Sequence, residues 1–218
     1  MTSTTADAEC PLCSHRGSFV RLRGPLGFGY SECSACRLIF MDRASLPSPE
    51  DEKRRYATHR NGPQHPGYVR FLEQAIAPAL PYLDESMRGL DFGCGPVPTL
   101  SVLLARRGLR CEDYDPFFEP KVLPPGRFHF IFATEVFEHL FWPGRELRLI
   151  RDVLRPQGLL VVMTELWTPC REFSEWHYAR DTTHVSFYDR RTIESICRLY
   201  SFRRLPSGNA RVLLLQKA

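Results

Sequence analysis

The sequence contains no long hydrophobic run. None of its stretches reaches the roughly eighteen apolar residues that a helix needs to cross a membrane. Its first ten residues, MTSTTADAEC, also lack the apolar core of a secretory signal. We therefore expect a soluble cytoplasmic protein that has no membrane partner.

A large excess of charge of one sign is missing as well. The formal net charge is only +4 over 218 residues. The paired basic residues are scattered along the chain: Arg54 and Arg55, Arg106 and Arg107, Arg190 and Arg191, and Arg203 and Arg204. This distribution is weak support for a nucleic-acid partner. With 43% hydrophobic residues, the chain can bury one full core and carry a small appendage.

Cysteine is present in a pattern that predicts a metal site. Cys10 and Cys13 form one CxxC pair, Cys33 and Cys36 form a second, and the glycine-rich RLRGPLGFGYSE between them suits a hairpin. Four thiolates in two such pairs favour a structural zinc ribbon, because they close the tetrahedral shell. Disulfides are the alternative, which a reducing compartment disfavours. The remaining cysteines are expected to be ordinary buried thiols: Cys94, Cys111, Cys170 and Cys197.

The segment after the ribbon, residues 43–88, is expected to be a helical linker and substrate cap. Ser48 is a good helix start, with Asp51 placed to close a capping box onto it, and this helix would carry Tyr56. A second helix is indicated by YVRFLEQAIAPAL, which spaces apolar residues on one face until Pro78 disturbs it.

From residue 89 the pattern changes to strands that alternate with helices, which is typical of a parallel sheet covered on both faces. The run GLDFGCGP is a short strand that ends in Asp91, followed by a tight turn at Gly93 and Gly95. Glycines in such a turn let the backbone approach a ligand closely. The next strand, RCEDYD, ends in Asp115, where an acid can accept both hydroxyls of a ribose.

These motifs resemble the class I S-adenosylmethionine-dependent methyltransferases over about residues 88–218. Three later segments fit the same family: FHFIFATE, RPQGLLVVMTE and ARVLLLQK. The resemblance implies an α/β, Rossmann-like sheet, mostly parallel with an antiparallel closing strand. It also implies that the turn Asp91, Gly93, Cys94 and Gly95 holds the methionyl end of S-adenosylmethionine, and that Asp115 holds the ribose. A nicotinamide-binding domain would show GxGxxG where this chain has GCGPVP.

The chain departs from the family pattern at two points. Val97, between two prolines, replaces the third small residue of the turn. Only PFFEPKVLPPGR separates Asp115 from the next strand, so the sheet is expected to be shortened in the middle, without the third strand that usually contacts adenine. Phe117 and Phe118 can lie against the base or belong to the core. The expected domains are a zinc ribbon (1–42), the helical cap (43–88) and the cofactor-binding domain (89–218).

The stretch FATEVFEHLF places Glu135, Glu138 and His139 at the carboxyl edge of the sheet, where open α/β sheets bind ligands. A helical turn there would bring all three to one side. Three hypotheses remain open. Glu135 can orient the cofactor edge, His139 can act as a general base, or the three can bind a second divalent metal together with the later His184.

The last set, Glu135, Glu138, His139 and His184, resembles the metal ligands of small-RNA 3'-terminal 2'-O-methyltransferases. The loop from Trp176 to Tyr188 is expected to form part of the acceptor wall, because it is dense in polar and aromatic groups. The preceding helices would add three further residues: Tyr56, His59 and Tyr68.

The function expected from these patterns is S-adenosylmethionine-dependent methyl transfer to a small-molecule or metabolite acceptor by in-line displacement. The catalytic candidates are His139, Glu135 and His184. Two alternatives stay open. One is an RNA methyltransferase, with metal-assisted ribose 2'-O-methylation, and the other is a binding protein that keeps the fold without chemistry.

Overall fold

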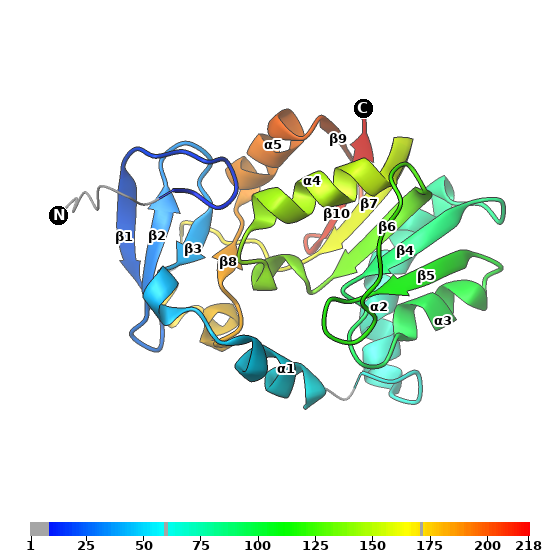
Figure 1. Cartoon of the computed structure of the whole chain (residues 1–218), viewed down its shortest axis with the longest axis horizontal. Coiled ribbons are helices and arrows are strands. Elements are labelled where there is room, and N and C mark those ends of the chain that lie inside the picture. The colour runs from blue at the N-terminus through cyan, green and yellow to red at the C-terminus, as the bar shows by residue number, and fades with distance from the viewer. Residues whose placement is uncertain (1–8, 59–60, 171) are drawn as a thin grey trace.

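The computed structural model describes residues 9–58, 61–170 and 172–218, and its strands form two sheets (Figure 1). The smaller sheet is antiparallel throughout, in the order β1-β2-β3-β8. Its strands are β1 (Phe19–Arg23), β2 (Gly29–Cys33), β3 (Ile39–Met41) and β8 (Ser186–Phe187). The expected hairpin is therefore present between the two cysteine pairs, and a strand from far along the chain completes its sheet.

The larger sheet has six strands in the order β5-β4-β6-β7-β10-β9. Their bounds are β4 (Arg88–Phe92), β5 (Arg110–Tyr114), β6 (Phe128–Thr134), β7 (Leu154–Met163), β9 (Phe202–Leu205) and β10 (Val212–Lys217). Strands β5, β4, β6 and β7 run parallel, while β10 is antiparallel to both β7 and β9. This arrangement confirms the predicted α/β, Rossmann-like sheet with its antiparallel closing strand.

Five α-helices are described: α1 (Pro49–Ala57), α2 (Pro66–Ala79), α3 (Thr99–Ala105), α4 (Pro143–Val153) and α5 (Arg190–Leu199). Short 3-10 turns add η1 (Arg43–Ser45), η2 (Leu80–Tyr82), η3 (Phe137–His139), η4 (Phe173–Glu175) and η5 (His177–Arg180). Within the described residues, none of the helices has the length and apolar character required to cross a membrane.

Helices cover both faces of the larger sheet because its strands are apolar on both sides. Along β6, Phe130 and Phe132 pack with α2 and α3, whereas Ile131 and Ala133 pack with α4 and α5. Figure 1 shows α4 and α5 together on one side of the strands and α2 and α3 on the other. The sheet is therefore the middle layer of a three-layer sandwich, and its strand ends remain accessible for a ligand.

The two helices expected before the sheet are present. Ser48 is the N-cap of α1 and accepts a hydrogen bond from the amide of Asp51 (3.2 Å). Helix α2 ends at Ala79, one residue after Pro78, and a 3-10 turn follows. In Figure 1, α1 spans the gap between the two sheets, below β8.

The middle of the sheet is shortened as predicted. Between β5 and β6 the described chain forms no helix or strand beyond an isolated bridge from Asp115 to Glu119. Strand β5 is consequently an edge of the sheet. The segment that follows it is a loop, in which Val122 is almost fully exposed.

The cysteine-containing segment packs directly on the larger sheet. Pro11 O accepts a hydrogen bond from the amide of Gly144, at the start of α4 (3.0 Å), and Leu12 O accepts one from the Tyr200 hydroxyl (2.7 Å). Cys10 and Leu12 share one hydrophobic core with residues of α4 and β7. The division at residues 42 and 88 remains a prediction, since β8 belongs to the sheet of the first segment and to the chain of the last.

Candidate functional site

The four cysteines of the two CxxC pairs converge at the N-terminal end of the molecule. Their sulfur atoms all lie within 4.8 Å of one another, with 3.5 Å between Cys10 and Cys36 and 3.7 Å between Cys13 and Cys33. A tetrahedral zinc with bonds of about 2.3 Å requires sulfur atoms about 3.8 Å apart. The group therefore has the size of a four-thiolate metal site.

The two cysteine turns also repeat one backbone pattern. The amide of Ser14 donates to Cys10 O (3.0 Å), and the amide of Arg37 donates to Cys33 O (2.9 Å). Ser14 and Arg37 each follow the second cysteine of a pair, and each has a left-handed conformation, with φ of 59° and 66°. Two turns of the same shape thus present their thiols to one point.

The other four cysteines differ from the expectation of buried thiols. All eight cysteines carry free thiols, and Cys170 is exposed, which corrects the prediction for that residue. It lies in the loop after β7, where no core covers it. The other three, Cys94, Cys111 and Cys197, are partly buried.

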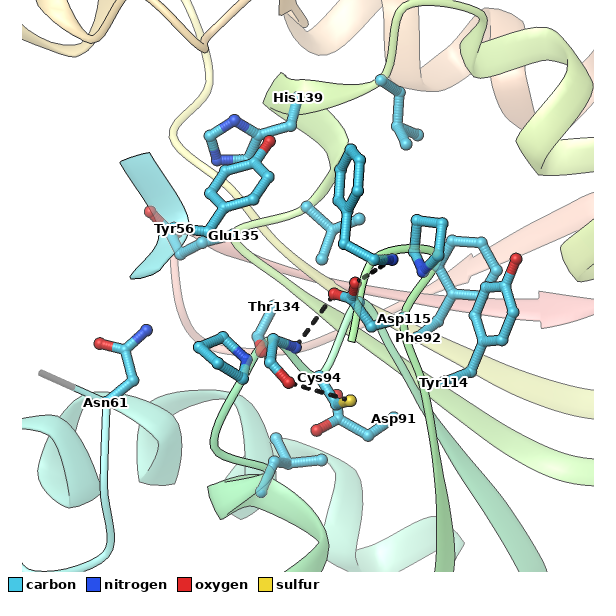
Figure 2. Close-up of a pocket in the computed structure, with 18 of the residues that line it drawn as sticks. Tyr56, Asn61, Asp91, Phe92, Cys94, Tyr114, Asp115, Thr134, Glu135 and His139 are labelled. Carbon is cyan, nitrogen blue, oxygen red and sulfur yellow. Dashed lines mark hydrogen bonds between the residues drawn. The ribbon is translucent and has the colours of Figure 1, made fainter. Parts of the chain in front are cut away.

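A cavity of about 660 Å³ opens at the carboxyl ends of β4, β5 and β6. Its floor is the turn from Asp91 to Gly95, and its opposite end reaches His139 and His184. In Figure 2, Tyr56 and His139 lie together, at the far end of the view from Asp91 and Cys94. One continuous space thus joins the predicted cofactor turn to the predicted catalytic histidines.

The glycine turn has the shape that close ligand approach requires. Gly93 and Gly95 have φ of 85° and 67°, values that other residues rarely adopt. A side chain at Gly93 would collide with Val136, whereas the space beside Gly95 is open. The amides of Gly93 and Cys94 donate to Tyr114 O of β5, which fixes the turn (2.7 and 3.1 Å).

Asp91 is buried at the base of this cavity. Its Oδ1 atom has no hydrogen-bond partner. Burial raises the pKa of Asp91 well above its usual range, and the neighbouring Asp113 and Asp115 raise it further. A buried acceptor without a partner is costly to the folded protein. Because Asp91 lines the cavity, a cationic ligand group can satisfy it there.

Asp115 lies at the tip of β5, where the sequence placed it. Its carboxylate accepts hydrogen bonds from the amides of Gly95 (3.1 Å), Phe117 (2.8 Å) and Phe118 (3.2 Å), two of which are drawn in Figure 2. Asp115 therefore ties the glycine turn to the loop that replaces the third strand. Phe117 lines the cavity, and Phe118 packs beneath the ammonium of Lys53.

The acidic and histidine residues after β6 separate into two groups. Glu138, His139 and His184 bring one ligand atom each within 4.8 Å of one another. Glu135 instead faces Arg211, whose Nη2 lies 3.3 Å from both carboxylate oxygens. The expected helical turn is a 3-10 turn that begins after Glu135, which has a φ of 53°. The predicted set of four is thus a cluster of three beside an ion pair.

The cluster of three is held by a surrounding shell of hydrogen bonds. Glu138 is fully buried, and it accepts from the Thr164 hydroxyl (2.9 Å) and the Tyr178 hydroxyl (2.5 Å). His139 Nδ1 donates to Thr183 O (2.9 Å) and His184 Nδ1 donates to Tyr178 O (2.7 Å), since a carbonyl can only accept.

This shell fixes the chemistry of the two imidazoles. Each neutral ring carries its proton on Nδ1 and its lone pair on Nε2. Burial lowers the pKa of His184, and the nearby His139 lowers it further, which favours the neutral ring. Outer hydrogen bonds of this kind are typical of histidines that bind metals or accept protons.

Comparison with known proteins identifies the family. The model of a family described as "Methyltransferase domain" matches residues 56–205, which is more than half of the chain. The chain belongs to the class I methyltransferases.

One solved structure agrees in fold, and a second is similar at a lower score. A Haloferax volcanii complex between the Trm112 methyltransferase activator and the putative methyltransferase matches with a TM-score of 0.54 and 12% identity, covering 76% of this chain and 96% of that one. A Methanosarcina mazei structure described as SAM-dependent methyltransferases matches with a TM-score of 0.48 and 15% identity, covering 63% and 95%. No curated protein matches this chain. The family implies S-adenosylmethionine as cofactor.

The loop after β7 lines the cavity of the methyltransferase with fewer residues than expected. Asp181 and His184 line it, while Trp176 packs with Tyr30 and Phe187 in an aromatic core against the smaller sheet. Many aromatic residues of this loop therefore pack in a hydrophobic core against the smaller sheet, and only part of the loop lines the cavity. Of the helical residues expected in the wall, Tyr56 and Tyr68 line the cavity, and His59 lies outside the described residues.

Several residues of the site carried no signal in the sequence. Arg211 joins Glu135 to Glu165 from the start of the closing hairpin, and Thr164 holds Glu138 from the end of β7. Glu52 projects into the cavity from α1. These residues lie far apart in the chain, so only the register of the sheet and the docking of α1 bring them together.

Proposed function

We propose that this methyltransferase transfers the methyl group of S-adenosylmethionine to a small, non-anionic acceptor by in-line displacement. The observation that carries the proposal is the single cavity, which joins the buried, unpartnered Oδ1 of Asp91 to two histidines, His139 and His184, whose Nδ1 atoms bond to backbone carbonyls. The first feature suits the cationic amino acid end of the cofactor, and the second suits an acceptor that must lose a proton.

The residues around the turn fit this cofactor. Asp91 would accept from its ammonium group, and the open space at Gly95 would admit its main chain beside the backbone. Asp115 would face the ribose, with lone pairs remaining beyond its three amide contacts. When bound, the cofactor supplies an activated methyl group on a sulfonium.

The charge of the cavity supports a non-anionic acceptor. Six carboxylates line it, and no lysine or arginine does so among the described residues: Glu52, Asp91, Asp115, Glu135, Glu146 and Asp181. Burial raises the pKa values of Glu52 and Glu146, which favours their neutral forms, so the other acids carry most of the negative charge. A phosphate-bearing acceptor would find no cation among these lining residues and would be repelled by those acids that are ionised. This argues for a small molecule over RNA, because binding to nucleic acid depends on cationic contacts to phosphates.

The catalytic role falls to His139 or His184 when the acceptor is a hydroxyl or amine. As the acceptor atom attacks the methyl carbon and the bond from carbon to sulfur breaks, the acceptor proton passes to an imidazole Nε2. The Nδ1 hydrogen bonds to Thr183 O and Tyr178 O then stabilise the resulting imidazolium. Glu135, beside Arg211, would orient the cofactor side of the cavity.

A divalent metal is the second candidate for this cluster, and the donor set favours it. Glu138, His139 and His184 offer one buried carboxylate and two imidazoles, a combination suited to first-row divalent ions. Such an ion would polarise an acceptor oxygen and lower the pKa of the acceptor hydroxyl. The same set supports the RNA ribose 2'-O-methyltransferase alternative, which the acidic lining opposes. At the N-terminal end, the four cysteines would hold a structural zinc.

Calorimetry with S-adenosylmethionine and S-adenosylhomocysteine tests the core of the proposal. We expect one binding site per chain. If neither ligand binds, the protein keeps the methyltransferase fold but does not transfer methyl groups, and the proposal is wrong. A second assay would offer labelled cofactor to a panel of amines, phenols, alcohols and short RNAs. Methylation of RNA, with binding that weakens steeply as salt rises, would instead select the RNA alternative.

A further inference from the structure

The smaller sheet reaches the acceptor end of the cavity through its last strand. Strand β8 pairs with β3 in the register Ile39 to Phe187 and Phe40 to Ser186. His184, which lines the cavity, lies two positions before the first residue of β8. The sheet built on the cysteine turns is therefore continuous with the segment that carries a predicted catalytic side chain.

Val185 is the link between the two parts. Its carbonyl accepts from the amide of Met41 in β3 (2.8 Å), and its own amide donates to Glu138 O (2.8 Å). The next residue, Ser186, donates from its hydroxyl to Leu140 O (2.7 Å). Two backbone bonds and one side-chain bond thus connect β3, through Val185 and Ser186, to the turn that carries Glu138 and His139.

The cysteine site controls where β3 begins. The amide of Cys33 donates to Leu38 O (2.9 Å), one residue before β3, and Arg37 between them has a left-handed φ of 66°. Such a conformation persists where surrounding structure imposes it. Metal coordination by Cys33 and Cys36 would impose it, and with it the position of β3.

The cofactor end of the cavity is held from elsewhere. The turn at Gly93 and Cys94 bonds to Tyr114 O, and Gly95 bonds to Asp115, so its supports come from β5 and the loop after it. Strand β5 is at the opposite edge of the larger sheet from β9 and β10 and lies outside the smaller sheet. The two ends of the cavity therefore have separate scaffolds.

We propose that the metal-loaded cysteine ribbon is a positioning element for the acceptor end of the active site, acting through β3, Val185 and β8 on Glu138, His139 and His184. Its effect on the cofactor end is small. The inference rests on the proposed acceptor role of the cluster, although its structural test does not require the acceptor to be known.

The test removes one link and leaves the metal ligands untouched. Met41→Pro deletes the amide that bonds to Val185 O. The matched control is Tyr200→Phe, which deletes the hydrogen bond to Leu12 O at the other cysteine turn, on the side of α5. Zinc content of both variants is checked by native mass spectrometry, so that any effect arises with the metal site filled.

Two readouts separate the ends of the cavity. Nitrogen-15 spectra of the histidine rings report whether His139 and His184 keep their protons on Nδ1, and calorimetry reports the Kd for S-adenosylhomocysteine. For Met41→Pro we expect loss of the single Nδ1 tautomer at both rings and a Kd within about threefold of the parent protein. Tyr200→Phe should leave both readouts unchanged.

Either of two results would overturn the inference: unaltered ring spectra in Met41→Pro, or a loss of cofactor affinity as large as the change at the histidines. If Met41→Pro does not fold, Cys36→Ser in a metal-free buffer decides by the same two readouts against the zinc-loaded parent. Absence of cofactor binding in the parent protein would instead defeat the proposed function, while the ring spectra would still report on the ribbon.

Discussion

At the scale of single residues, the cavity concentrates groups that cost stability in the empty protein. Asp91 has an orphaned buried oxygen, and Glu135 has a left-handed backbone conformation beside another buried acid. Strain and unsatisfied polarity of this kind are common at functional sites. The placement of Asp91, Gly93 and Gly95 in a strand and the tight turn after it could be predicted, because this pattern determines its own geometry, while their cofactor-binding role stays a prediction.

Replacing Asp91 tests whether this residue lowers the stability of the ligand-free protein and strengthens cofactor binding. We expect Asp91→Asn to weaken S-adenosylmethionine binding by about 10- to 100-fold, the usual value of one charged hydrogen bond. The same change should stabilise the ligand-free protein by about 1 kcal/mol or more, because it replaces an acid whose ionisation is disfavoured by burial with a neutral side chain. Calorimetry and urea unfolding measure the two effects.

Asp113→Asn is the matched control. Asp113 of β5 is the register neighbour of Asp91 in β4. Unlike Asp91, Asp113 is not among the residues that line the cavity. Cofactor affinity should stay within about threefold of the parent. Equal losses in both variants would mean that the charge of the strand ends, and not a direct contact, governs binding.

Glu135 predicts a dependence of stability on pH. Burial and the neighbouring Glu138 raise its pKa to about 7, although Arg211 opposes both. Because the folded protein binds this proton more tightly than the unfolded chain, the stabilisation is complete below about pH 4.5 and is lost as pH rises through 7. Glu135→Gln should therefore gain up to about 3 kcal/mol on the parent between pH 5 and pH 8. Urea unfolding of both proteins at pH 5 and pH 8 measures this gain. A difference in the free energy of unfolding that is the same at the two pH values would contradict the prediction.

At the scale of elements, α1 is a small helix that carries Glu52 and Tyr56 over the cavity, and an ion pair joins it to the loop after β7. Arg55 contacts Asp181 Oδ2 through Nε (3.1 Å) and Nη2 (2.6 Å). Burial alone would raise the pKa of Asp181, but hydrogen bonds from Arg55 and Thr183 hold it well below its usual range. The pair therefore contributes above about pH 4 and is lost in stronger acid.

Arg55→Met should release α1 while leaving the rest of the fold in place. Arg55 is about half exposed, so we expect global stability to fall by less than about 1 kcal/mol. Amide hydrogen exchange in α1 should rise several-fold. Arg54→Met is the control, because the ion pair of Arg54 is with Asp51 inside the same helix. Equal exchange in the two variants would show that the ion pair does not fasten the helix.

The helices and strands themselves followed local patterns, whereas the turn after β6 did not. Spacing of three and four predicted that Glu135, Glu138 and His139 share a helical face. The actual 3-10 turn begins after Glu135, because that residue takes a left-handed conformation and donates its amide to Met163 O of β7 (2.8 Å). A contact to a distant strand overrides the local periodicity there.

At the scale of the whole molecule, the cysteine ribbon is part of the main core. Cys10→Ser should abolish zinc in native mass spectra and lower stability by more than about 2 kcal/mol, because a structural zinc contributes folding free energy directly. Cys170→Ser, at an exposed thiol, is the matched control and should change neither quantity. Retention of the metal and of full stability in Cys10→Ser would remove the basis for a zinc site.

The order of the large sheet could be predicted because each strand and crossover has a sequence pattern and the family resemblance supplied the order. The pairing of β8 with β3 could not, since it joins two residues to a strand more than 140 positions earlier in the chain. The same holds for the ion pair between Arg211 and Glu135. Long-range contacts made by short segments leave no periodic signal.

Because the sheet ends at β5, no further strand of the described chain lies beside it to contact the adenine of a bound cofactor. The loop containing Pro116 and Phe117, which follows β5, lines the cavity there. Nucleosides enlarged at the exocyclic nitrogen of the base would therefore meet a deformable loop in place of a rigid strand. Tolerance of bulky donor analogues should follow directly from the shortened architecture.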